Sequence, residues 1–380
     1  MTGFRIPFFR PSIEDDDIEA VAASMRSGWL TSGPNVKALE EELAVYCGAN
    51  TVNAVNSCTA ALHLALAAWG IGPGDEVITT PYTFAATVNV IVHVGATPVL
   101  VDIRSSDFNI DPEQIERAIT PHTRAIVPVH FAGEPCDMES IRAIARRHNL
   151  KVLEDAAHAI GTAYRGQMIG SFGDAAAFSF YATKNMTTGE GGALASHDPG
   201  LAEKVRELTL HGMTKDAWNR YDAGGAWRYD IASFGFKDNM TDMAAALGRR
   251  QLLRLDRFIE QRTRVAMRYL ANLREDERFI LPGYDPANRQ AWHLFVVRLD
   301  PAHATVTRED AIRRLADAGI QASVHFIPVH TFSAYRALGR WQDGDFPVAE
   351  AAFAGAISLP MFPDMTDAEV DEVCEALQRL

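Results

Sequence analysis

The residue best suited to covalent chemistry in this sequence is a lysine, Lys184, at the end of an apolar run. The run "AAAFSFYATK" is typical of a buried strand, and the glycine-rich segment "TTGEGG" comes two residues after it. Burying an ammonium group costs several kcal/mol unless the charge is paired or neutralised. We therefore expect Lys184 to have a chemical role or a path to solvent.

Other reactive side chains also stand where apolar runs end. Asp155 ends the run "KVLED", His158 follows three residues later, and Ser179 precedes Lys184 in the next run. In a parallel α/β sheet, ligands bind beyond the carboxyl ends of the strands. The spacing therefore predicts that these side chains gather at one edge of a sheet.

A possible phosphate site lies earlier in the chain, where Cys58 and Thr59 join the run "TVNAV" to the helical pattern "AALHLALAAW". Backbone N–H groups and hydroxyls at a helix N-terminus can cradle a phosphate. A lysine, an acid and a phosphate cradle together suit pyridoxal 5′-phosphate (PLP). The lysine would form the Schiff base, the acid would keep the pyridine nitrogen protonated, and the cradle would hold the phosphate.

Each of these features has an ordinary structural interpretation. A Ser/Thr cluster before a helix is often a simple N-cap, and an Asp at a strand end often caps a turn. Lys184 could extend into solvent, and His158 could be a hydrogen-bonded structural histidine. Their occurrence in one chain order, on successive strand ends, favours the cofactor site.

The elements that would position these residues alternate between strand-like and helical patterns. Ser12 is the expected N-cap of a first helix that ends at Gly28. Short apolar runs separated by helical segments then predict βα units and a mostly parallel sheet; these runs are "TVNAV", "DEVITT", "TPVLVDI", "RAIVPV" and "KVLED". A long helical region begins at Thr241, with Gly248 as a possible interruption. We expect a large α/β domain over residues 1–255 and a smaller α+β domain over 256–380.

Composition excludes several classes of protein. The 380 residues are 47% hydrophobic and 22% charged, with a net charge of −13, which disfavours nucleic-acid binding but not small anionic ligands. Four scattered cysteines indicate neither a disulfide framework nor a metal site. The most apolar stretch is interrupted by polar residues, glycine and proline, so no membrane span is expected. The N-terminal segment turns acidic too early for a signal peptide, so we expect a cytoplasmic protein.

The chain also resembles a known family over nearly its whole length. The segments "AVNSCTAALHLAL", "EDAAHAIGTAYRGQMIG" and "SFGDAAAFSFYATKNMTTGEGGAL" are similar to the core of the DegT/StrS group of PLP-dependent sugar aminotransferases. That group has the fold type I architecture of aspartate aminotransferase. Within it, the chain is similar to enzymes that aminate C4 of nucleotide-linked 4-keto sugars, such as the one that makes UDP-4-amino-4-deoxy-L-arabinose.

The resemblance implies a role for each candidate residue. Lys184 matches the Schiff-base lysine, Asp155 the partner of the pyridine nitrogen, and His158 a residue beside the ring. The remaining matches are to phosphate ligands (Ser179, Cys58, Thr59), a flat contact over the ring (Phe84) and the sugar side (Thr31, Ser32, His325, His330). Core packing is an alternative for Phe84, and loop or packing roles are alternatives for the four sugar-side residues.

One segment departs from the family pattern. Where many relatives read G-Y-N-Y-R, with the Asn reaching the phosphate of the neighbouring subunit's cofactor, this chain reads "GFKDN". Lys237 therefore replaces that Asn, and Asn239 stands at the Arg position. A lysine can serve a phosphate electrostatically. The resemblance implies a homodimer with shared active sites, to which this segment contributes.

The activity implied by the resemblance is transfer of an amino group from an amino acid, by family default L-glutamate, to a nucleotide-linked keto sugar. Two alternatives remain: a sugar dehydratase that uses PLP, and a non-catalytic regulatory protein of the same fold. Relatives that dehydrate sugars replace the lysine with His, and pseudo-enzymes usually lose the lysine or the acid. Lys184 and Asp155 are both present and favour the aminotransferase.

Overall fold

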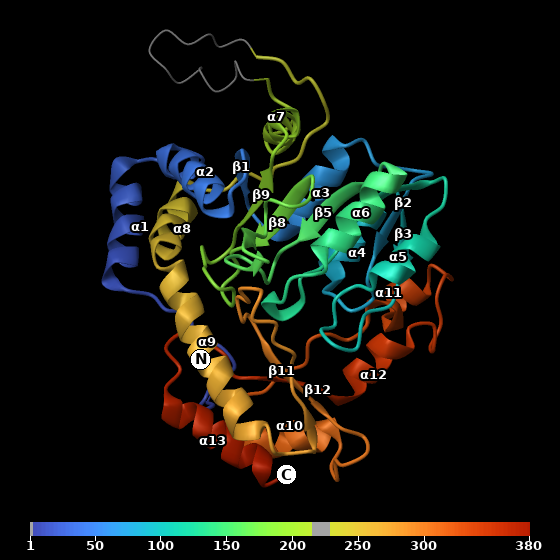
Figure 1. The fold of residues 1–380 in the computed structure, drawn as a ribbon. Helices are drawn as coiled ribbons and strands as arrows, with labels where there is room; N and C mark the ends of the chain where they lie inside the picture. The colour runs from blue at the N-terminus through green and yellow to red at the C-terminus, as the bar shows by residue number, and fades with distance from the viewer. Residues whose placement is uncertain (1–2, 215–228) are drawn as a thin grey trace.

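The computed structural model describes residues 3–214 and 229–380. Two units, each with its own sheet, make up this part of the chain. In Figure 1 the larger unit lies in the upper part of the view, and the smaller unit, with β11, β12, α10 and α13, lies below it. The helix α9 runs from one unit into the other.

The larger unit contains a seven-stranded sheet in the order β1-β9-β8-β5-β4-β2-β3. Its β9 pairs antiparallel with β1 and with β8, and the other neighbours pair parallel. The predicted mostly parallel sheet is therefore confirmed. The strands are β1 (Thr51–Val55), β2 (Glu76–Thr79), β3 (Thr97–Leu100), β4 (Thr123–Ile126), β5 (Lys151–Asp155), β8 (Ala175–Ser179) and β9 (Gly192–Ser196).

Helices cover both faces of this sheet because successive residues of each strand point to opposite sides. In β5, Val152 packs into the core under α2, α5, α6 and α8, whereas Leu153 packs into the core under α3, α4 and α7. The flanking helices are α2 (Pro34–Cys47), α3 (Cys58–Ala68), α4 (Ala85–His93), α5 (Pro112–Ala118), α6 (Met138–His148), α7 (Pro199–Leu208) and α8 (Asp242–Leu253). A small hairpin, β6 (Ala163–Tyr164) and β7 (Gln167–Met168), follows β5.

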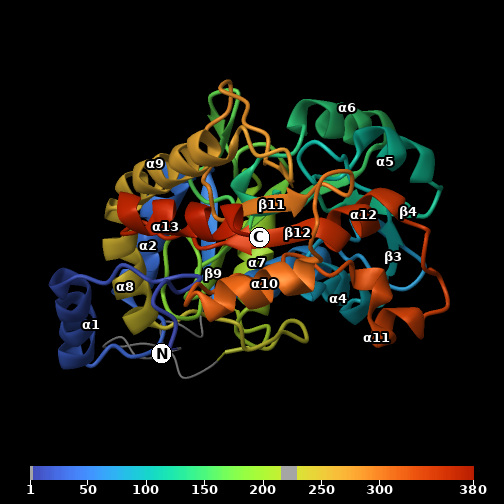
Figure 2. The ribbon, with the colours of Figure 1, turned by 90° about the horizontal axis from the view of Figure 1, so that it is seen from below.

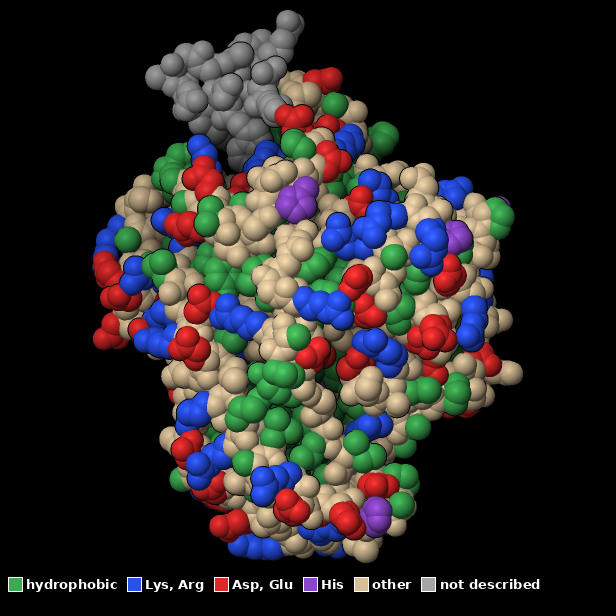
Figure 3. All heavy atoms as spheres, in the orientation of Figure 1, with side chains coloured by type: hydrophobic (Ala, Val, Ile, Leu, Met, Phe, Trp, Pro, Cys, Tyr) green, Lys and Arg blue, Asp and Glu red, His purple; other side chains and the backbone are tan. Residues whose placement is uncertain are grey.

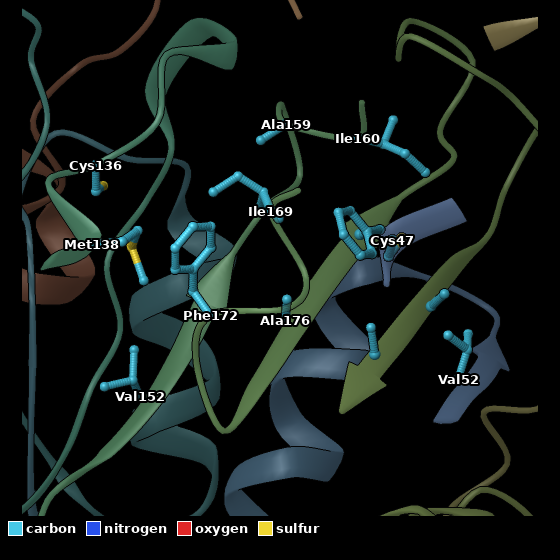
Figure 4. Close-up of a cluster of buried hydrophobic side chains, with 14 of the residues drawn as sticks. Cys47, Val52, Cys136, Met138, Val152, Ala159, Ile160, Ile169, Phe172 and Ala176 are labelled. Atoms are coloured by element: carbon cyan, nitrogen blue, oxygen red, sulfur yellow. The ribbon is translucent and has the colours of Figure 1, made fainter. Parts of the chain in front are cut away.

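The first of these cores is drawn in Figure 4. Apolar side chains from several segments, among them Val52, Val152 and Phe172, converge there. Cys47 and Cys136 are part of the same cluster, and both are free thiols. Burial raises the pKa of both thiols, so they act as small apolar side chains in this core.

The first helix differs from its prediction at one end. The helix α1 (Asp15–Ser27) ends at Gly28, which adopts the left-handed conformation (φ 84°) as predicted. Its N-cap is Glu14 and not Ser12. Glu14 forms a capping box with Asp17, in which each side chain accepts from a backbone N–H at the other residue. The acidic run therefore supplies the cap as well as the first turn.

The long helical region is interrupted at Arg254 and not at Gly248. Thr241 caps α8 with its side chain, and α9 (Leu255–Leu273) begins after a break at Arg254. Gly248 lies inside α8, where a Cβ would meet the Thr188 methyl group at 2.8 Å and a Leu39 methyl group at 3.1 Å. Glycine is used there for close helix packing rather than for a break.

The smaller unit has a three-stranded antiparallel sheet in the order β10-β11-β12. Figure 2 shows this unit from below. It consists of the C-terminal part of α9, β10 (Phe279–Ile280), β11 (Phe295–Leu299), α10 (Arg308–Asp317), α11 (Ser333–Arg336), α12 (Pro347–Gly355), β12 (Ala356–Leu359) and α13 (Asp367–Gln378).

The helix α9 contributes to the cores of both units, and the N-terminal segment of the chain packs against the smaller unit. Leu255 and Ile259 belong to the core of the larger unit, whereas Tyr269 and Leu273 belong to the core of the smaller one. Ile6 also packs in the smaller core, and its backbone N–H donates to the Gly319 carbonyl (3.1 Å). The predicted boundary between residues 255 and 256 thus falls at the first turn of α9. The N-terminal segment, although it precedes this boundary in sequence, packs against the smaller unit.

The surface carries acidic and basic side chains interspersed with one another over the face in Figure 3, with no broad area of one sign. Within residues 3–214 and 229–380, no helix is both long and apolar enough to cross a membrane. The same residues contain no cluster of His, Cys, Asp or Glu suited to a metal ion.

Candidate active site

A cavity of about 600 Å³ lies where the two units meet. The larger unit contributes Asp155, Ser179 and Lys184 to its wall, and the smaller unit contributes His325 and Phe326. Most of the residues singled out in the sequence are therefore brought together, although they are separated by up to 267 positions along the chain (58 to 325).

Lys184 reaches the cavity because the chain turns sharply after β8. The Lys184 N–H donates to the Tyr181 carbonyl, and the Thr188 N–H returns to the Phe180 carbonyl, both at 2.9 Å. The side chain is partly buried, and burial lowers the pKa of Lys184 to about 8, against weaker opposing effects of Cys58 and Asp155. The loop thus presents an amine that loses its proton far more easily than an exposed lysine does.

Asp155 is the last residue of β5 and is buried. Its Oδ2 accepts a hydrogen bond from the Thr87 hydroxyl (2.7 Å), and its Oδ1 accepts from the Ala157 N–H (3.2 Å). The Thr83 hydroxyl lies 2.8 Å from that of Thr87, so a short polar chain supports the carboxylate. Burial raises the pKa of Asp155, while the bonds from Thr87 and Ala157 and the charge of Lys184 oppose the rise.

The N-terminus of α3 forms one end of the cavity. Ser57 caps the helix by accepting from the Ala60 N–H (3.1 Å), and Cys58 and Thr59 are its first two residues. A Cβ on Gly192 would lie 2.5 Å from the Cys58 nitrogen, so glycine is required for β9 to approach the helix end this closely. Free N–H groups of the first turn and the nearby Ser179 make an anion site there.

The Cys58 thiol itself faces the protein rather than the cavity. It donates to the Ala177 carbonyl (3.4 Å), and burial raises the pKa of the thiol well above its ordinary value. Cys58 can therefore serve a phosphate through its backbone N–H, whereas a thiolate at this position is disfavoured.

Aromatic rings line another part of the cavity wall. The His158 ring stacks on Phe326, with centroids 5.7 Å apart and planes 18° apart, and burial lowers the pKa of His158 well below its ordinary value. Phe84, the residue before α4, is 65% exposed at the rim, with its ring centroid 6.4 Å from that of Phe326. A large exposed aromatic side chain at a cavity rim is available to contact a ligand.

The two sugar-side histidines lie in different surroundings. His325 lines the cavity, its Nδ1 is 2.9 Å from the Ser358 hydroxyl, and burial lowers the pKa of His325 to about 4. His330 is buried away from the cavity, where its Nε2 is 3.0 Å from a carboxylate oxygen of Glu350 and its ring packs on Phe346. Substrate contact by His330 stays a prediction, and this chain places the residue in the core of the fold.

Thr31 and Ser32 lie outside the cavity, together with the segment "GFKDN" (residues 235–239) that departs from the family pattern. Ser32 accepts from the Asn239 amide (2.8 Å) and donates to the Met240 carbonyl (2.9 Å), and Lys237 bonds to Asn239. The Thr31 carbonyl accepts from the Asp242 N–H. The roles of Thr31 and Ser32 at a sugar, and of Lys237 and Asn239 at a phosphate, stay predictions.

Sequence reasoning missed several residues that build the site. Thr87 and Asn185 are buried beside Asp155 and Lys184, and His293 and Phe326 line the cavity. Two signals were present in the sequence: an amide residue immediately after Lys184, and a histidine within the otherwise apolar run "AWHLFVVRL". No spacing signal links Thr87 to a carboxylate 68 residues further on.

The donor set fits the predicted cofactor. Lys184 offers an amine for an aldehyde, Asp155 offers a buried carboxylate that forms no ion pair with the described residues, and the α3 N-terminus offers N–H groups for a phosphate. The cavity volume of about 600 Å³ is within the range of small-molecule sites. PLP therefore matches the residues that are present.

Comparison with known proteins agrees with this geometry. Residues 11–378 match the model of the DegT/DnrJ/EryC1/StrS aminotransferase family. The spore coat polysaccharide biosynthesis protein SpsC of Bacillus subtilis is 50% identical over 374 residues, which cover 98% of this chain and 96% of that protein.

Solved structures show the same fold. The PMP-form of a protein described as "Putative sugar aminotransferase" from Streptococcus pneumoniae has a TM-score of 0.93 and 36% identity, covering 99% of this chain and 98% of that one. Its PLP-form has a TM-score of 0.92 and 35% identity, with 98% of each chain covered. The predicted fold type I architecture is confirmed, and so is PLP as the cofactor.

Proposed function

Since the chain belongs to the DegT/DnrJ/EryC1/StrS aminotransferase family, we propose that it moves an amino group from L-glutamate to C4 of a nucleotide-linked 4-keto sugar. It is a PLP-dependent sugar aminotransferase. The amino donor, the nucleotide and the carbon that is aminated are the proposed details. They come from the resemblance to C4 aminotransferases and from the polysaccharide-related name of the Bacillus subtilis relative.

The observation that carries the proposal is the convergence of Lys184, Asp155 and the α3 N-terminus on one cavity. When bound, PLP supplies an aldehyde that takes up the amino group and a ring that withdraws electrons. The Asp155 carboxylate is placed to hold a proton on the ring nitrogen, and the N–H groups of α3 to hold the phosphate.

Lys184 is suited to act as the base that moves a proton at Nζ. With a pKa of about 8, about a tenth of this amine is uncharged at pH 7, against about one in three thousand at its ordinary pKa of 10.5. Burial supplies this change because it disfavours the charged form. The neighbouring His158 stays neutral and adds no competing positive charge.

The sugar would enter on the side of His325, Phe326 and Phe84. Flat aromatic surfaces with polar atoms between them suit a sugar ring and its attached base. At neutral pH His325 is uncharged, because burial lowers its pKa to about 4, so it would contact the substrate through hydrogen bonds and not through charge.

We further propose a homodimer in which the segment around Lys237 and Asn239 reaches the partner's cofactor site. In support, this segment, Thr31 and Ser32 lie together outside the chain's own cavity. Mixing Lys184→Ala chains with Lys237→Ala/Asn239→Ala chains tests it, since a mixed dimer would hold one complete site. Recovered activity supports shared sites, and no recovery in dimers verified by mass contradicts them.

The protein would work in the cytoplasm. All four cysteines, Cys47, Cys58, Cys136 and Cys374, are free and buried, which is compatible with a reducing compartment. Fractionation of cells that produce the tagged protein would test this assignment, and recovery outside the cytoplasm would contradict it.

A half-reaction screen tests the proposed substrate. The protein is converted to its amine-loaded form with L-glutamate, and nucleotide-linked 4-keto and 3-keto sugars are added one at a time. Return of the aldehyde absorbance with a 4-keto sugar, and release of the 4-amino product, supports the proposal. A response to 3-keto sugars alone contradicts C4 amination. Release of a dehydrated sugar without nitrogen would favour the dehydratase alternative.

A further inference from the structure

Two imidazole rings, His158 and His293, pack against each other in the wall of the cavity. Their centroids are 4.3 Å apart and their planes are tilted by 42°. Both side chains are buried, and both line the cavity beside Lys184. His158 was expected beside the cofactor ring, whereas the role of His293 follows from the hydrogen bonds around it.

Those hydrogen bonds place the two neutral rings in opposite tautomers. The Ala132 N–H donates to Nδ1 of His158 (3.3 Å), so the proton of His158 is on Nε2. The Asn185 amide donates to the Ala291 carbonyl (2.6 Å), so its oxygen is left to accept from Nδ1–H of His293 (3.1 Å). His158 therefore presents an N–H donor at Nε2, and His293 presents a lone pair at Nε2.

The backbone around His293 is held in an unusual conformation. Trp292 has φ 46° and Ala132 has φ 56°, both in the left-handed region that residues with a side chain rarely adopt. A Cβ on Gly133 would lie 2.9 Å from the Trp292 nitrogen. Such conformations persist where the surroundings over-determine them, and they are concentrated at functional sites.

A buried arginine fixes the same segment from the other side. The Arg262 guanidinium donates to the carbonyl oxygens of Trp292 (3.2 Å), His293 (3.3 Å) and Met361 (3.2 Å). It has no carboxylate partner among residues 3–214 and 229–380. Arg262 therefore serves to position backbone, and part of that backbone carries the His293 ring.

Because the side chain at position 185 is an uncharged amide, it does not favour a positive charge on His293 or on Lys184. Burial lowers the pKa of both His158 and His293 well below the ordinary value. A carboxylate in place of the Asn185 amide would stabilise an imidazolium at His293 and also attract the ammonium of Lys184. The charged or titratable groups that act on this pair are Lys184, His325 and Arg262, and Asp155 lines the same cavity.

We propose that Asn185 and His293 are positioning residues: the Asn185 amide locks His293 as its Nδ1–H tautomer, and the His293 ring holds His158 in place. The two imidazoles then stay uncharged in fixed and opposite tautomers, and Lys184 is the amine in this wall that exchanges a proton. The proposal rests on the PLP site but goes beyond the assigned reaction, because it is independent of the substrate.

Tautomers can be measured directly on the full-length protein labelled with ¹⁵N-histidine, with and without PLP. Long-range ¹H–¹⁵N spectra distinguish protonated from unprotonated ring nitrogens, and a His293→Gln or His293→Asn variant, whichever folds, identifies the signals. We expect His293 to be protonated at Nδ1 only, from pH 6 to 9. A titrating His293, or a proton on its Nε2, overturns the proposal whatever the substrate is.

Substituting Asn185 tests the functional consequence, with Asn50→Asp as the matched control because it adds the same charge on the surface. In Asn185→Asp, His293 should titrate within this pH range, and the pH midpoint of the visible absorbance of bound PLP should rise by about one unit or more. A shift no larger than that of Asn50→Asp overturns the proposal.

A second substitution removes the acceptor without adding charge. In Asn185→Leu the two tautomers of His293 should mix, and kcat should fall on the order of 10²-fold with little change in KM, because the ring positions degrade while substrate contacts remain. If His293 keeps a single tautomer in this variant and kcat equals that of the wild-type protein, the proposed role of Asn185 is overturned.

Discussion

The two walls of the cavity are built in different ways. The wall from the larger unit carries Asp155, the last residue of β5, and Lys184, which lies in the turn five residues after β8, so both groups follow neighbouring strands of one sheet. The wall from the smaller unit carries His293, His325 and Phe326, which lie outside strands and helices and are held by ring stacking and side-chain hydrogen bonds.

We infer that the first wall supplies the reacting groups and that the second wall orients the ligand. The groups proposed to bind or move protons, Asp155 and Lys184, lie at or just beyond the ends of two strands that pair in parallel. The rings proposed to orient the ligand come from loops, whose conformations depend on contacts made by distant residues. Substitutions in the first wall should therefore affect turnover most, and substitutions behind the second wall that do not touch the His158–His293 pair should affect stability more than turnover.

Replacing Lys184 with Ala should give the largest effect. Without the amine no group in this wall can take its place, and transamination should fall on the order of 10⁴-fold or more, as for other residues that act covalently. Steady-state assays, with circular dichroism to check folding, measure this. Lys184→Arg is the matched control, because it keeps the charge but not the nucleophile. Substantial activity in either variant would contradict the assignment.

Replacing Asp155 with Asn keeps the shape and removes the charge. Transamination should fall on the order of 10²- to 10³-fold, because the ring nitrogen loses its charge-assisted partner, while PLP still binds through α3 and Lys184. Kinetics and cofactor titration measure the two effects separately. Near wild-type turnover in this variant would refute the role of the carboxylate.

A smaller effect is expected from Thr87→Val, one residue behind the first wall. The Thr87 hydroxyl donates to Asp155 and holds its pKa down, so its loss should raise the pKa of Asp155 further. As the pH is lowered, Asp155 would then take up a proton and lose its charge at a higher pH than in the wild-type protein. We expect the acid limb of the kcat/KM profile to move to higher pH, with about a tenfold loss of activity or less at pH 8.

The control for this prediction is Thr120→Val, a hydroxyl far from the cavity on the surface. It should leave the acid limb where it is in the wild-type protein. An acid limb that moves to lower pH in Thr87→Val, or does not move relative to the control, would show that the hydroxyl does not support the charged form of Asp155.

The smallest effect on turnover is expected behind the second wall, at His330. Its ring is buried, its Nε2 lies 3.0 Å from the partly exposed carboxylate of Glu350, and it does not line the cavity. His330→Gln should lower the free energy of unfolding by about 1–3 kcal/mol, because the hydrogen bond and packing of a buried ring are disturbed, and should leave KM for the sugar within about twofold. Urea unfolding and kinetics test this. A large rise in KM at unchanged stability would place His330 at the substrate after all.

The contrast between the walls also explains what could be predicted from the sequence. The runs "TVNAV" and "KVLED" coincide with β1 and β5, and Asp155 and Lys184 follow from strand ends, because local periodicity determines both. The pairing of Asn185 with His293 spans 108 positions, and that of Thr87 with Asp155 spans 68. No local pattern records such contacts, which depend on how the two units pack.

Two local details were wrong for a similar reason. Ser12 was expected to cap α1, but Glu14 does so because it can also accept from the N-terminal turn while Asp17 bonds back. Gly248 was a possible interruption of the long helix, but the helix continues through it, and the absence of a side chain allows close contact with Leu39 and Thr188. In both cases the residue type alone suggested that a helix begins or ends there, but contacts with neighbouring residues determine where the helix boundary lies.

The most direct test of the account is to locate the cofactor covalently. Borohydride reduction of the PLP-bound protein, followed by digestion and mass spectrometry, fixes the pyridoxyl group on the amine that holds it. We predict that the group is found on the peptide containing Lys184, and that Asp155→Asn protein gives the same peptide. A pyridoxyl group on any other lysine would contradict the assignment of this cavity as the active site.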